Sequence, residues 1–563
     1  MITNGLSASA AISFNNYFRS GSNRTKSIQT FTPTKGTAGD TVYTKLGQTT
    51  SLSGTEPNLG QYRNFAIQAF VNYHRTFGKH DITAMGMFNS DNSTIDKSDI
   101  YAGTSGANLS LAYKNNGGGG RITYVNNNKY IAEFSMAYMG SENYAPGKRY
   151  GAFPAGSVGW ILSNEGFLKQ SKALSFLKIR AAYGLTGYDE IGGQRFMFYQ
   201  TYPFGSGYFF GTGTTNTASL SEGRLANPDV TWEKETKTNA GLDATFFNHL
   251  DVSLDVFNHD RDDILVSANR TIPLILGYTD LPSVNQGKVN NKGFEASLRY
   301  RNNEKRLVQF FAEANIFNAH NNIINNAQTI QLNPGQVTEG RRINQPYGLK
   351  ALGLFATDAE AAASPKPIGV TVRAGDVKYE DVGGPLGKPD GIIDANDNQP
   401  IGNTGLPEWT LGIHTGIKYK GFDLDFILQG VSGNTVYLGG NQFRPFQNFG
   451  QAGEIALERW TSATAATATF PRLTVDNNSN NLNNYRFSSL YQRNGSFIKL
   501  RSVEVGYSLP ENLISRIRLQ QARLFLNGTN LFSIDHIKYG DPEALSTGYP
   551  SLRTITLGAR IQL

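Results

Sequence analysis

Residues 553–563 read RTITLGARIQL, in which apolar and polar side chains alternate without a break. The apolar members are Ile555, Leu557, Ala559, Ile561 and Leu563. A period of two places them on one face of a β-strand. About eleven residues also suffice for a tilted strand to cross a bilayer. This stretch predicts a strand with one apolar face, and the rest of the sequence repeats its pattern.

The same alternation recurs in pairs of runs joined by very short turns, which predict β-hairpins. We expect these turns at Gly78–Lys79, Asn126–Asn128, Asn248–His249, Asn302–Asn303 and Lys420–Gly421. A first strand is predicted at Leu6–Tyr17, and a further pair at Phe153–Ser163 and Leu174–Leu185. The pair Ser496–Leu509 and Ala522–Phe532 changes parity between Leu500 and Val503, which predicts a β-bulge. The whole chain contains about sixteen such strands by this pattern.

The connections between strands alternate between short and long. The long ones read as polar loops. They fall near residues 18–61, 188–232, 267–288, 319–407 and 431–495, and we expect all of them on one side. Outer-membrane barrels have this asymmetry, with short periplasmic turns and long extracellular loops. The sequence therefore predicts an all-β protein, an antiparallel transmembrane β-barrel over residues 1–563 with a long extracellular loop at about 319–407. Secreted β-sandwiches are the alternative, but their strands seldom reach ten residues.

In a barrel, the charged faces of the strands would line a watery lumen and the apolar faces would meet lipid. The charged residues in question are Asp251, Asp255, Glu295, Arg299, Glu313, Asp423 and Asp425. Aromatic residues beside the turns, at Phe246, Tyr300, Tyr419 and Phe422, are typical of an interface girdle.

Composition narrows the functional classes. Charged residues make up 17% of the chain, mean hydropathy is -0.37, and no run of 18 residues is continuously apolar. The net charge of +7 comes from scattered Lys and Arg, so nucleic-acid binding is not expected. With no cysteine, disulfides and thiol ligands are excluded. No arrangement of nucleophile, base and orienting group is evident, which predicts that the protein is not an enzyme.

An acidic segment, DVKYEDVGGPLGKPDGIIDANDNQ at residues 376–399, contains part of a calcium-loop pattern. Asp390, Asp394 and Asp397 would supply carboxylates and Ile392 a backbone carbonyl, with Gly391 at the sharp turn. The first half of the loop does not fit, and a solvated acidic turn is the alternative. No other cofactor is indicated.

Several spaced segments resemble one family, the SusC/RagA-type TonB-dependent transporters of Bacteroidota outer membranes. They include RYGAFPAGSVGW at 149–160, LKIRAAYGLTG at 177–187, NPDVTWEKETKTNAGLD at 227–243, NKGFE at 291–295, GDVKYEDV at 375–382, YKGFDLDFILQG at 419–430, SFIKLRSVEVGYSLP at 496–510 and NGTNLF at 527–532. The resemblance runs from about residue 60 to the end.

This resemblance implies the barrel of a transporter that imports oligosaccharides or peptides, covered by a SusD-like surface lipoprotein and driven by the TonB complex. Family barrels have about twenty-two strands and a plugged lumen. Nothing in the sequence resembles the family's plug domain, TonB box or N-terminal extension, and the opening MITNGLSASA resembles no signal peptide. TonB would therefore act only through N-terminal parts absent from this sequence. About six strands would be missing, so we expect a gap or a distorted seam between the strands at Leu6 and Ile555.

Two further functional classes stay open, a passive porin and a surface adhesion barrel. The substrate cannot be read from the sequence. The weak candidates for substrate contact are the aromatic residues Tyr202, Phe204, Tyr208, Phe209 and Phe210, which could stack on sugar rings. They could equally form a small core of their own loop.

Overall fold

The computed structural model describes residues 4–21, 24–36, 39–54, 58–96, 112–191, 195–209, 211–212, 216–268, 272–278, 280–302, 306–446, 451–475, 480–514, 519–544 and 549–562. Three of the residues singled out above, Phe210, Asn303 and Leu563, lie outside this part of the chain.

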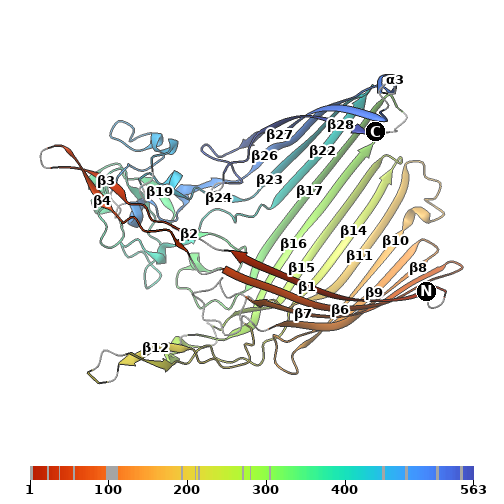
Figure 1. Ribbon diagram of the computed structural model, residues 1–563, viewed down its shortest axis with the longest axis horizontal. Coiled ribbons are helices and arrows are strands. Elements are labelled where there is room, and N and C mark those ends of the chain that lie inside the picture. The colour runs from red at the N-terminus through yellow and green to blue at the C-terminus, as the bar shows by residue number, and fades with distance from the viewer. Residues whose placement is uncertain are drawn as a thin grey trace. The chain divides into compact units, whose positions relative to one another are not determined.

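Sixteen strands follow one another in a single sheet, in sequence order (Figure 1). They are β1 (Leu6–Gly21), β6 (Asn58–Phe77), β7 (His80–Asp96), β8 (Tyr113–Asn126), β9 (Tyr130–Ser141), β10 (Tyr150–Ile161), β11 (Leu174–Tyr188), β14 (Glu233–Phe246), β15 (Leu250–Ser267), β16 (Ser283–Arg301), β17 (Val308–Asn325), β22 (Trp409–Tyr419), β23 (Phe422–Ser432), β26 (Phe497–Ser508), β27 (Gln521–Asp535) and β28 (Thr554–Gln562). The expected number of strands is confirmed. The terminal strands of this order are β1 and β28, and whether these two edges meet stays a prediction.

The chain divides into two compact units. The first comprises residues 1–125, 133–155 and 187–232, and the second comprises 126–132, 156–186 and 233–563. In the first unit, β1 pairs antiparallel with β6 over its full length, and β6 pairs with β7. In the second unit, each consecutive pair from β14 to β28 is antiparallel.

Tight turns close the hairpins where the sequence predicts them. Asn127 and Asn128 have φ of 51° and 52°, and Lys420 and Gly421 have φ of 46° and 86°. Two successive left-handed residues match the right-handed twist of the strands, which is why Asn and Gly occupy these positions. In the β14–β15 turn the left-handed pair is Phe247 and Asn248, one residue earlier than expected.

The alternation of short and long connections holds throughout the second unit. Because β14, β15, β16, β17, β22 and β23 are successively antiparallel, the turn at Asn248 and the connection that contains Asn441 lie at opposite ends of the strands. The predicted topology is confirmed there.

Two connections that we expected to be irregular contain hairpins. Within 18–61, β1 continues to Gly21 and four short strands follow: β2 (Arg24–Thr25), β3 (Thr30–Lys35), β4 (Thr41–Leu46) and β5 (Ser53–Gly54). Within 188–232, β12 (Phe204–Phe209) pairs with β13 (Asn216–Leu220). The expectation of plain loops is wrong here. In β3 and β4, which read TFTPTK and TVYTKL, alternating Thr, Val and Tyr favour strands even though each run is short.

The other elements lie in the connections of the second unit. They are α1 (Asp358–Ala363), α3 (Glu511–Ile514), the short strands β18 (Tyr347–Gly348), β19 (Ala351–Leu354), β20 (Val377–Tyr379), β21 (Gln399–Pro400), β24 (Thr435–Tyr437) and β25 (Gln492–Asn494), the 3-10 helices η1 (Leu162–Asn164), η2 (Leu274–Leu276), η3 (Pro334–Gln336), η4 (Ala395–Asp397), η5 (Asn441–Phe443), η7 (Glu454–Glu458) and η9 (Ser489–Tyr491), and the π-helix η8 (Asn480–Asn484). No helix in the described part of the chain is long and apolar enough to cross a membrane.

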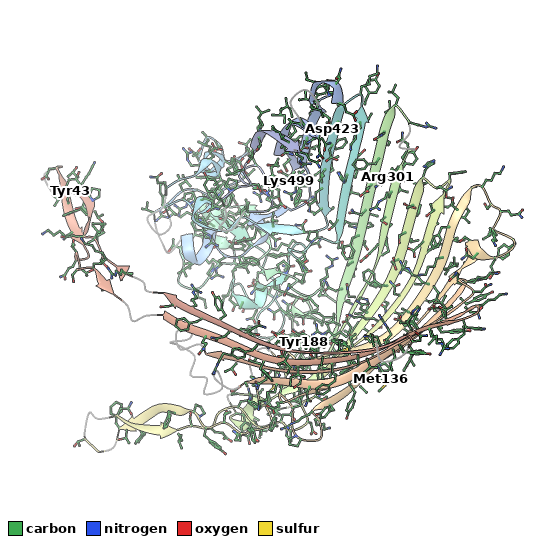
Figure 2. All side chains as sticks on the ribbon, turned by 45° about the vertical axis from the view of Figure 1, so that its right-hand side comes forward. Tyr43, Met136, Tyr188, Arg301, Asp423 and Lys499 are labelled. Carbon is green, nitrogen blue, oxygen red and sulfur yellow. The ribbon has the colours of Figure 1, made fainter. Side chains whose placement is uncertain are left out.

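The distribution of apolar side chains is inverted relative to a water-soluble domain. On β28, Ile555, Leu557 and Ile561 are 68%, 81% and 60% exposed. The buried hydrophobic clusters of the second unit instead lie in its long connections. Nearly all of their residues belong to the two longest, residues 326–408 and 433–496, which we call the loop body, and Ile537 of the β27–β28 connection completes one cluster. Figure 2 shows side chains projecting from both faces of the strands. The sheet thus has an exposed apolar face, and its core-like packing lies in the loops.

Candidate functional site

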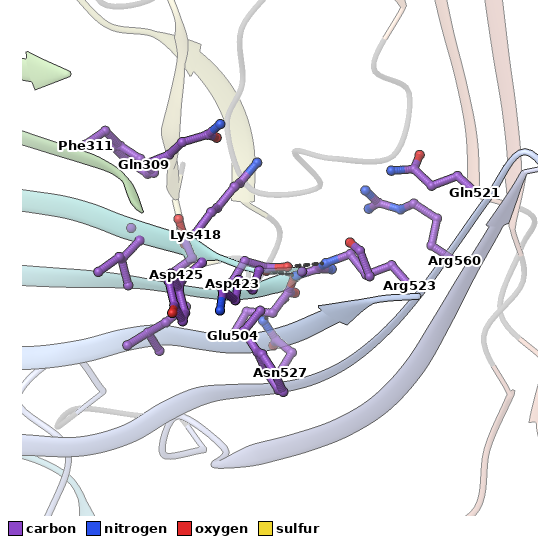
Figure 3. Close-up of a pocket in the computed structure, with 18 of the residues that line it drawn as sticks. Gln309, Phe311, Lys418, Asp423, Asp425, Glu504, Gln521, Arg523, Asn527 and Arg560 are labelled. Atoms are coloured by element: carbon purple, nitrogen blue, oxygen red, sulfur yellow. Dashed lines mark hydrogen bonds and ion pairs between the residues drawn. The ribbon is translucent and has the colours of Figure 1, made fainter. Parts of the chain in front are cut away.

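The face of the sheet opposite the exposed apolar residues carries a cavity of about 590 Å³ beside the Lys420–Gly421 turn (Figure 3). It is lined by side chains from β17, β22, β23, β26, β27 and β28. Its polar lining includes Lys418, Asp423, Glu504, Arg523 and Arg560. We call this side of the sheet the polar face.

Arg523 on β27 reaches across β26 to Asp423 on β23. Its Nε donates to Asp423 Oδ1 at 3.0 Å, its Nη2 donates to the other carboxylate oxygen, and the same Nη2 donates to Glu504 Oε1 at 2.7 Å. The guanidinium passes over Gly506 on β26, where an added Cβ would lie 2.3 Å from Arg523 Nη2. Gly506 therefore provides the space through which three strands are joined.

The same construction occurs again in the second unit. Arg180 on β11 passes over Gly241 on β14 and donates to both carboxylate oxygens of Asp255 on β15, at 2.5 and 2.6 Å. Its Nε donates to Asp243 at 3.0 Å. A Cβ at Gly241 would lie 2.6 Å from Arg180 Cζ. Arginine, glycine and aspartate on three successive strands thus form a bridge that neither a hairpin pattern nor a spacing rule reveals.

Several of the charged residues that we expected on one face do share the polar face. His414 and Asp425 lie 2.8 Å apart on β22 and β23, and Arg299 pairs with Glu313 at 2.9 Å across β16 and β17. Their strand neighbours point the other way, as Leu424 does with 38% exposure. The predicted alternation is therefore confirmed for these strands.

The bulge expected near Leu500 is present at Arg501, where the register shifts against both neighbouring strands. An extra residue reverses the parity of a strand. Lys499 and Arg501 face the polar side before the bulge and Glu504 faces it after, whereas Val505 is 47% exposed on the apolar face. The bulge thus places Lys499 and Arg501, which belong to one polar cluster, on the same face as Glu504, which belongs to another.

The first of these clusters fastens the connection between β27 and β28. The buried Lys499 ammonium pairs with Asp541 at 2.5 Å and Glu543 at 2.7 Å, and Arg501 also pairs with Glu543. Burial raises the pKa of the Asp541 carboxyl, but the bonds from Lys499 and Ser551 outweigh it and hold that pKa below its usual value. This contact could not be predicted from the sequence, because 42 residues separate Lys499 from Asp541.

Inside the loop body, a buried polar network joins its two connections. Asp376 is fully buried, ion-pairs with Arg472 at 2.8 Å, and accepts a hydrogen bond from Asn484 Nδ2 at 2.9 Å. The Tyr379 hydroxyl donates to the Asn483 carbonyl at 2.7 Å, and burial raises its pKa above the usual value. Residues of the GDVKYEDV segment therefore hold the two connections together.

An aromatic cluster lies beside the β10–β11 turn. Glu165 accepts hydrogen bonds from Lys129 Nζ at 2.8 Å, the Tyr130 hydroxyl at 2.8 Å and Trp160 Nε1 at 3.2 Å. These bonds, the one from Lys129 first, lower the pKa of Glu165 to about 2. Tyr130 and Trp160 stack with ring centroids 6.3 Å apart while staying partly exposed. Such amphipathic rings suit a membrane interface.

Of the four residues in the calcium prediction, the three aspartates use their carboxylates to accept hydrogen bonds from backbone amides. Asp397 accepts from the amides of Val382, Gly383 and Asp394, and Asp394 caps η4. Asp390 accepts from the amide of Ile392 at 3.0 Å. Among the described residues, no group of three or more His, Asp or Glu side chains is placed to hold a metal. Calcium binding here stays a prediction.

The aromatic candidates for substrate contact lie on and beside the β12–β13 hairpin of the first unit. Tyr202, Phe204, Tyr208 and Phe209 are between 56% and 82% exposed, and Phe210 is outside the described residues. These four residues therefore do not form a core of their own loop. Whether they contact a substrate stays a prediction.

Comparison with known proteins gives matches along most of the chain. No family model matches. TonB-dependent receptor P3 of Formosa agariphila is 26% identical over 559 residues, which covers 89% of this chain and 53% of the relative. TonB-dependent receptor SusC of Bacteroides thetaiotaomicron is 26% identical over 473 residues, covering 79% of this chain and 43% of the relative. The chain spans about half the length of these relatives.

Among solved structures, the RagAB peptide transporter superposes with a TM-score of 0.72 at 20% identity, and covers all of this chain and 60% of the other. This likeness concerns the fold. The proteins matched are named as receptors, transporters or importers, so the prediction that the chain is not an enzyme is confirmed.

Proposed function

We propose that this chain, which is of the SusC/RagA type of TonB-dependent transporters, forms the membrane-spanning wall of a nutrient importer for oligosaccharides or peptides. Proteins of this type reside in the cell outer membrane, and so does this one. The whole importer's activity, its substrate and its partners belong to the proposal.

The main support for this proposal is the exposure of apolar side chains on one face of the sheet. A strand such as β28, whose apolar side chains are more than half exposed, is stable only where a nonpolar solvent covers that face. Lipid is such a solvent. The polar face, with Arg523, Asp423 and Glu504, would then border an aqueous passage, as we expected for the lumen of a barrel.

We infer the orientation of the wall from its connections. The long connections, including the loop body, would be extracellular and the short turns periplasmic, as in other outer-membrane barrels. The loop body would then meet the substrate and a SusD-like lipoprotein. Coupling to the TonB complex would require the parts of the relatives that this chain does not match.

Growth and uptake test the proposal. A deletion strain is compared with its parent on a panel of glycans and peptides as sole nutrients, and uptake of the affected compound is measured with and without a functional TonB complex. Loss of TonB-dependent uptake on at least one compound is expected. Unchanged growth on every compound would refute import by this protein.

A passive porin is the second candidate, because sixteen strands are enough for a closed porin-sized barrel. A porin conducts without energy. Uptake that persists after inactivation of TonB, together with swelling of liposomes that contain the purified chain, would favour this candidate. Binding to cells without any uptake phenotype would instead indicate adhesion.

A further inference from the structure

The short turns of the second unit lie side by side at one end of its strands. We call residues 162–173, 247–249, 301–302, 306–307 and 420–421 the short-turn rim. Hydrogen bonds join neighbouring turns, since the amide of Phe247 donates to the Ala173 carbonyl at 2.8 Å and the amide of Arg301 donates to the His249 carbonyl at 2.9 Å. The strand residues that flank the β16–β17 and β22–β23 turns are paired in the sheet. The side chains of this rim therefore meet the same surroundings.

Five exposed cations lie on the short-turn rim without an ion-pair partner among the residues that the structure describes. They are Lys169, Lys172, Arg301, Arg306 and Lys420. Glu165 is the acidic side chain of the described rim, and Lys129 already pairs with it at 2.8 Å. The rim ends at the β26–β27 connection, where Glu511 is exposed. The rim thus carries an excess of positive charge.

The cations at the opposite ends of the same strands have acidic partners. At the first residues of β14, Lys234 pairs with Asp263 at 3.0 Å. Near the start of β16, Lys288 pairs with Asp262 at 2.9 Å. These strands therefore differ in charge between their two ends, and the unpaired cations lie at the end with the short turns.

An exposed apolar side chain accompanies the charge at each of these turns. Phe167, Phe247, Leu307 and Phe422 are 72%, 61%, 66% and 58% exposed. Apolar side chains gathered on one exposed surface indicate a contact with an apolar partner. Lysine and arginine interleaved with Phe and Leu are typical of segments that lie at a bilayer interface, where anionic lipids attract the charges and acyl chains cover the apolar groups.

We propose that the short-turn rim binds the headgroups of anionic phospholipids. Lys172, Arg306 and Lys420 would meet the phosphate groups, while Phe167 and Phe422 enter the apolar layer beneath them. The inference rests on the proposed membrane-spanning wall and names a lipid partner for one end of it. A zwitterionic headgroup carries its own cation beside the phosphate, so the excess charge of the rim selects the anionic class. An acidic protein surface would attract the cations but offers less apolar material to the rings.

Lipid binding by the purified full chain in a nonionic detergent tests this inference. The probes are fluorescent phosphatidylglycerol, which is anionic, and fluorescent phosphatidylcholine, which is zwitterionic. We expect tighter binding of phosphatidylglycerol at low salt. The preference should disappear as salt is raised to about 1 M, where the Debye length is about 3 Å. Equal affinity for the two lipids at low salt would overturn the inference.

A triple variant locates the binding on the rim. Lys172→Gln, Arg306→Gln and Lys420→Gln together remove three charges from exposed side chains that form no ion pair among the described residues. We expect this variant to bind phosphatidylglycerol about ten-fold more weakly and to bind phosphatidylcholine as the unaltered chain does. If it does not assemble, Lys169→Gln with Arg301→Gln serves as the second variant, with weakening in the same direction.

The matched control removes three exposed cations from the loop body. It combines Arg341→Gln, Arg373→Gln and Lys388→Gln. Because the net charge falls by the same amount as in the triple rim variant, the control separates the position of the charges from their number. We expect unchanged binding of phosphatidylglycerol. Equal weakening in the two triple variants, or none in the rim variants, would refute the assignment to the rim.

Growth separates this inference from the proposed function. If deletion of the gene abolishes growth on a nutrient but the purified chain shows no preference for phosphatidylglycerol, import stands and the lipid assignment fails. If the preference is present and depends on the rim but the deletion strain grows on every glycan and peptide, the lipid assignment stands and import fails.

Discussion

Substitution of Gly506 by alanine probes the bridge between Arg523 and Asp423. The new Cβ would lie 2.3 to 2.5 Å from three atoms of the Arg523 guanidinium, so the arginine must leave its position. It would lose its two bonds to Asp423 and one to Glu504. The substitution therefore tests whether glycine is present at this position to admit the arginine.

The cost follows from the bonds that are broken. A hydrogen bond to a charged group contributes about 1.5–3 kcal/mol. The three bonds share one guanidinium, and the carboxylates line a cavity in which water can replace part of the loss, so we expect about 2–4 kcal/mol in total. In an Arg523→Ala background no clash remains, and alanine in a strand should then be more stable than glycine by about 0.5–1 kcal/mol.

Urea unfolding in detergent measures this coupling through four proteins, namely the unaltered chain, the two single variants and the double variant. Gly86→Ala on β7 is the matched control, because a Cβ there meets nothing within 4 Å. We expect Gly506→Ala to destabilise only when Arg523 is present, and Gly86→Ala to have no such cost. An equal cost of Gly506→Ala in both backgrounds would refute the proposed role of the glycine.

Four further outcomes are expected. Gly241→Ala should likewise be costly only while Arg180 is present, by a similar 2–4 kcal/mol in the same unfolding assay. The Asp541 pKa is lowered in the folded state, so its ion pair contributes to folding stability above the ordinary carboxylate pKa of about 4, and this contribution is lost as pH falls further. Acid should therefore make the β27–β28 connection accessible to protease. Lys499→Met should make it accessible already at neutral pH. Calcium titration should give heat that Asp394→Ala removes if the acidic segment binds the ion, and no heat if the carboxylates only brace the backbone. Unpaired backbone groups in lipid cost several kcal/mol each, so the chain alone should not insert stably in liposomes unless β1 and β28 pair, and stable insertion with conduction would support the porin.

Much of the sheet could be predicted from the sequence, because the pattern that decides it is local. Alternation with a period of two and turn residues such as Asn127, Asn128 and Gly421 determine where strands begin, turn and end. The bulge at Arg501 could also be predicted, because the alternation of apolar and polar residues changes phase there in the sequence. The hairpin β3–β4 was missed because Thr-rich runs resemble polar loops as closely as exposed strands.

The contacts of the candidate sites could not be predicted, because they join residues far apart in the chain. Arg523 and Asp423 are separated by 100 residues, and Asp376 and Asn484 by 108. Glycine was the signal that could have helped: Gly506 and Gly241 interrupt apolar or polar alternation in long strands, where a glycine lowers stability unless a neighbour needs the space. A glycine within a long strand therefore indicates a large side chain on the adjacent strand.

The β27–β28 connection links the sheet to the loop body through two clusters of unequal strength. In the first cluster, Lys499 is only 5% exposed and pairs with Asp541 and Glu543. In the second cluster, Lys538 and Tyr539 bind Glu458, and Lys538 is 70% exposed. An exposed ion pair contributes at most about 1 kcal/mol, whereas breaking a buried one costs about 3–5 kcal/mol. Of these two clusters the one at Glu458 should therefore break first, while the packing of Ile537 and Tyr539 against the apolar cluster of the loop body keeps the connection in contact with it.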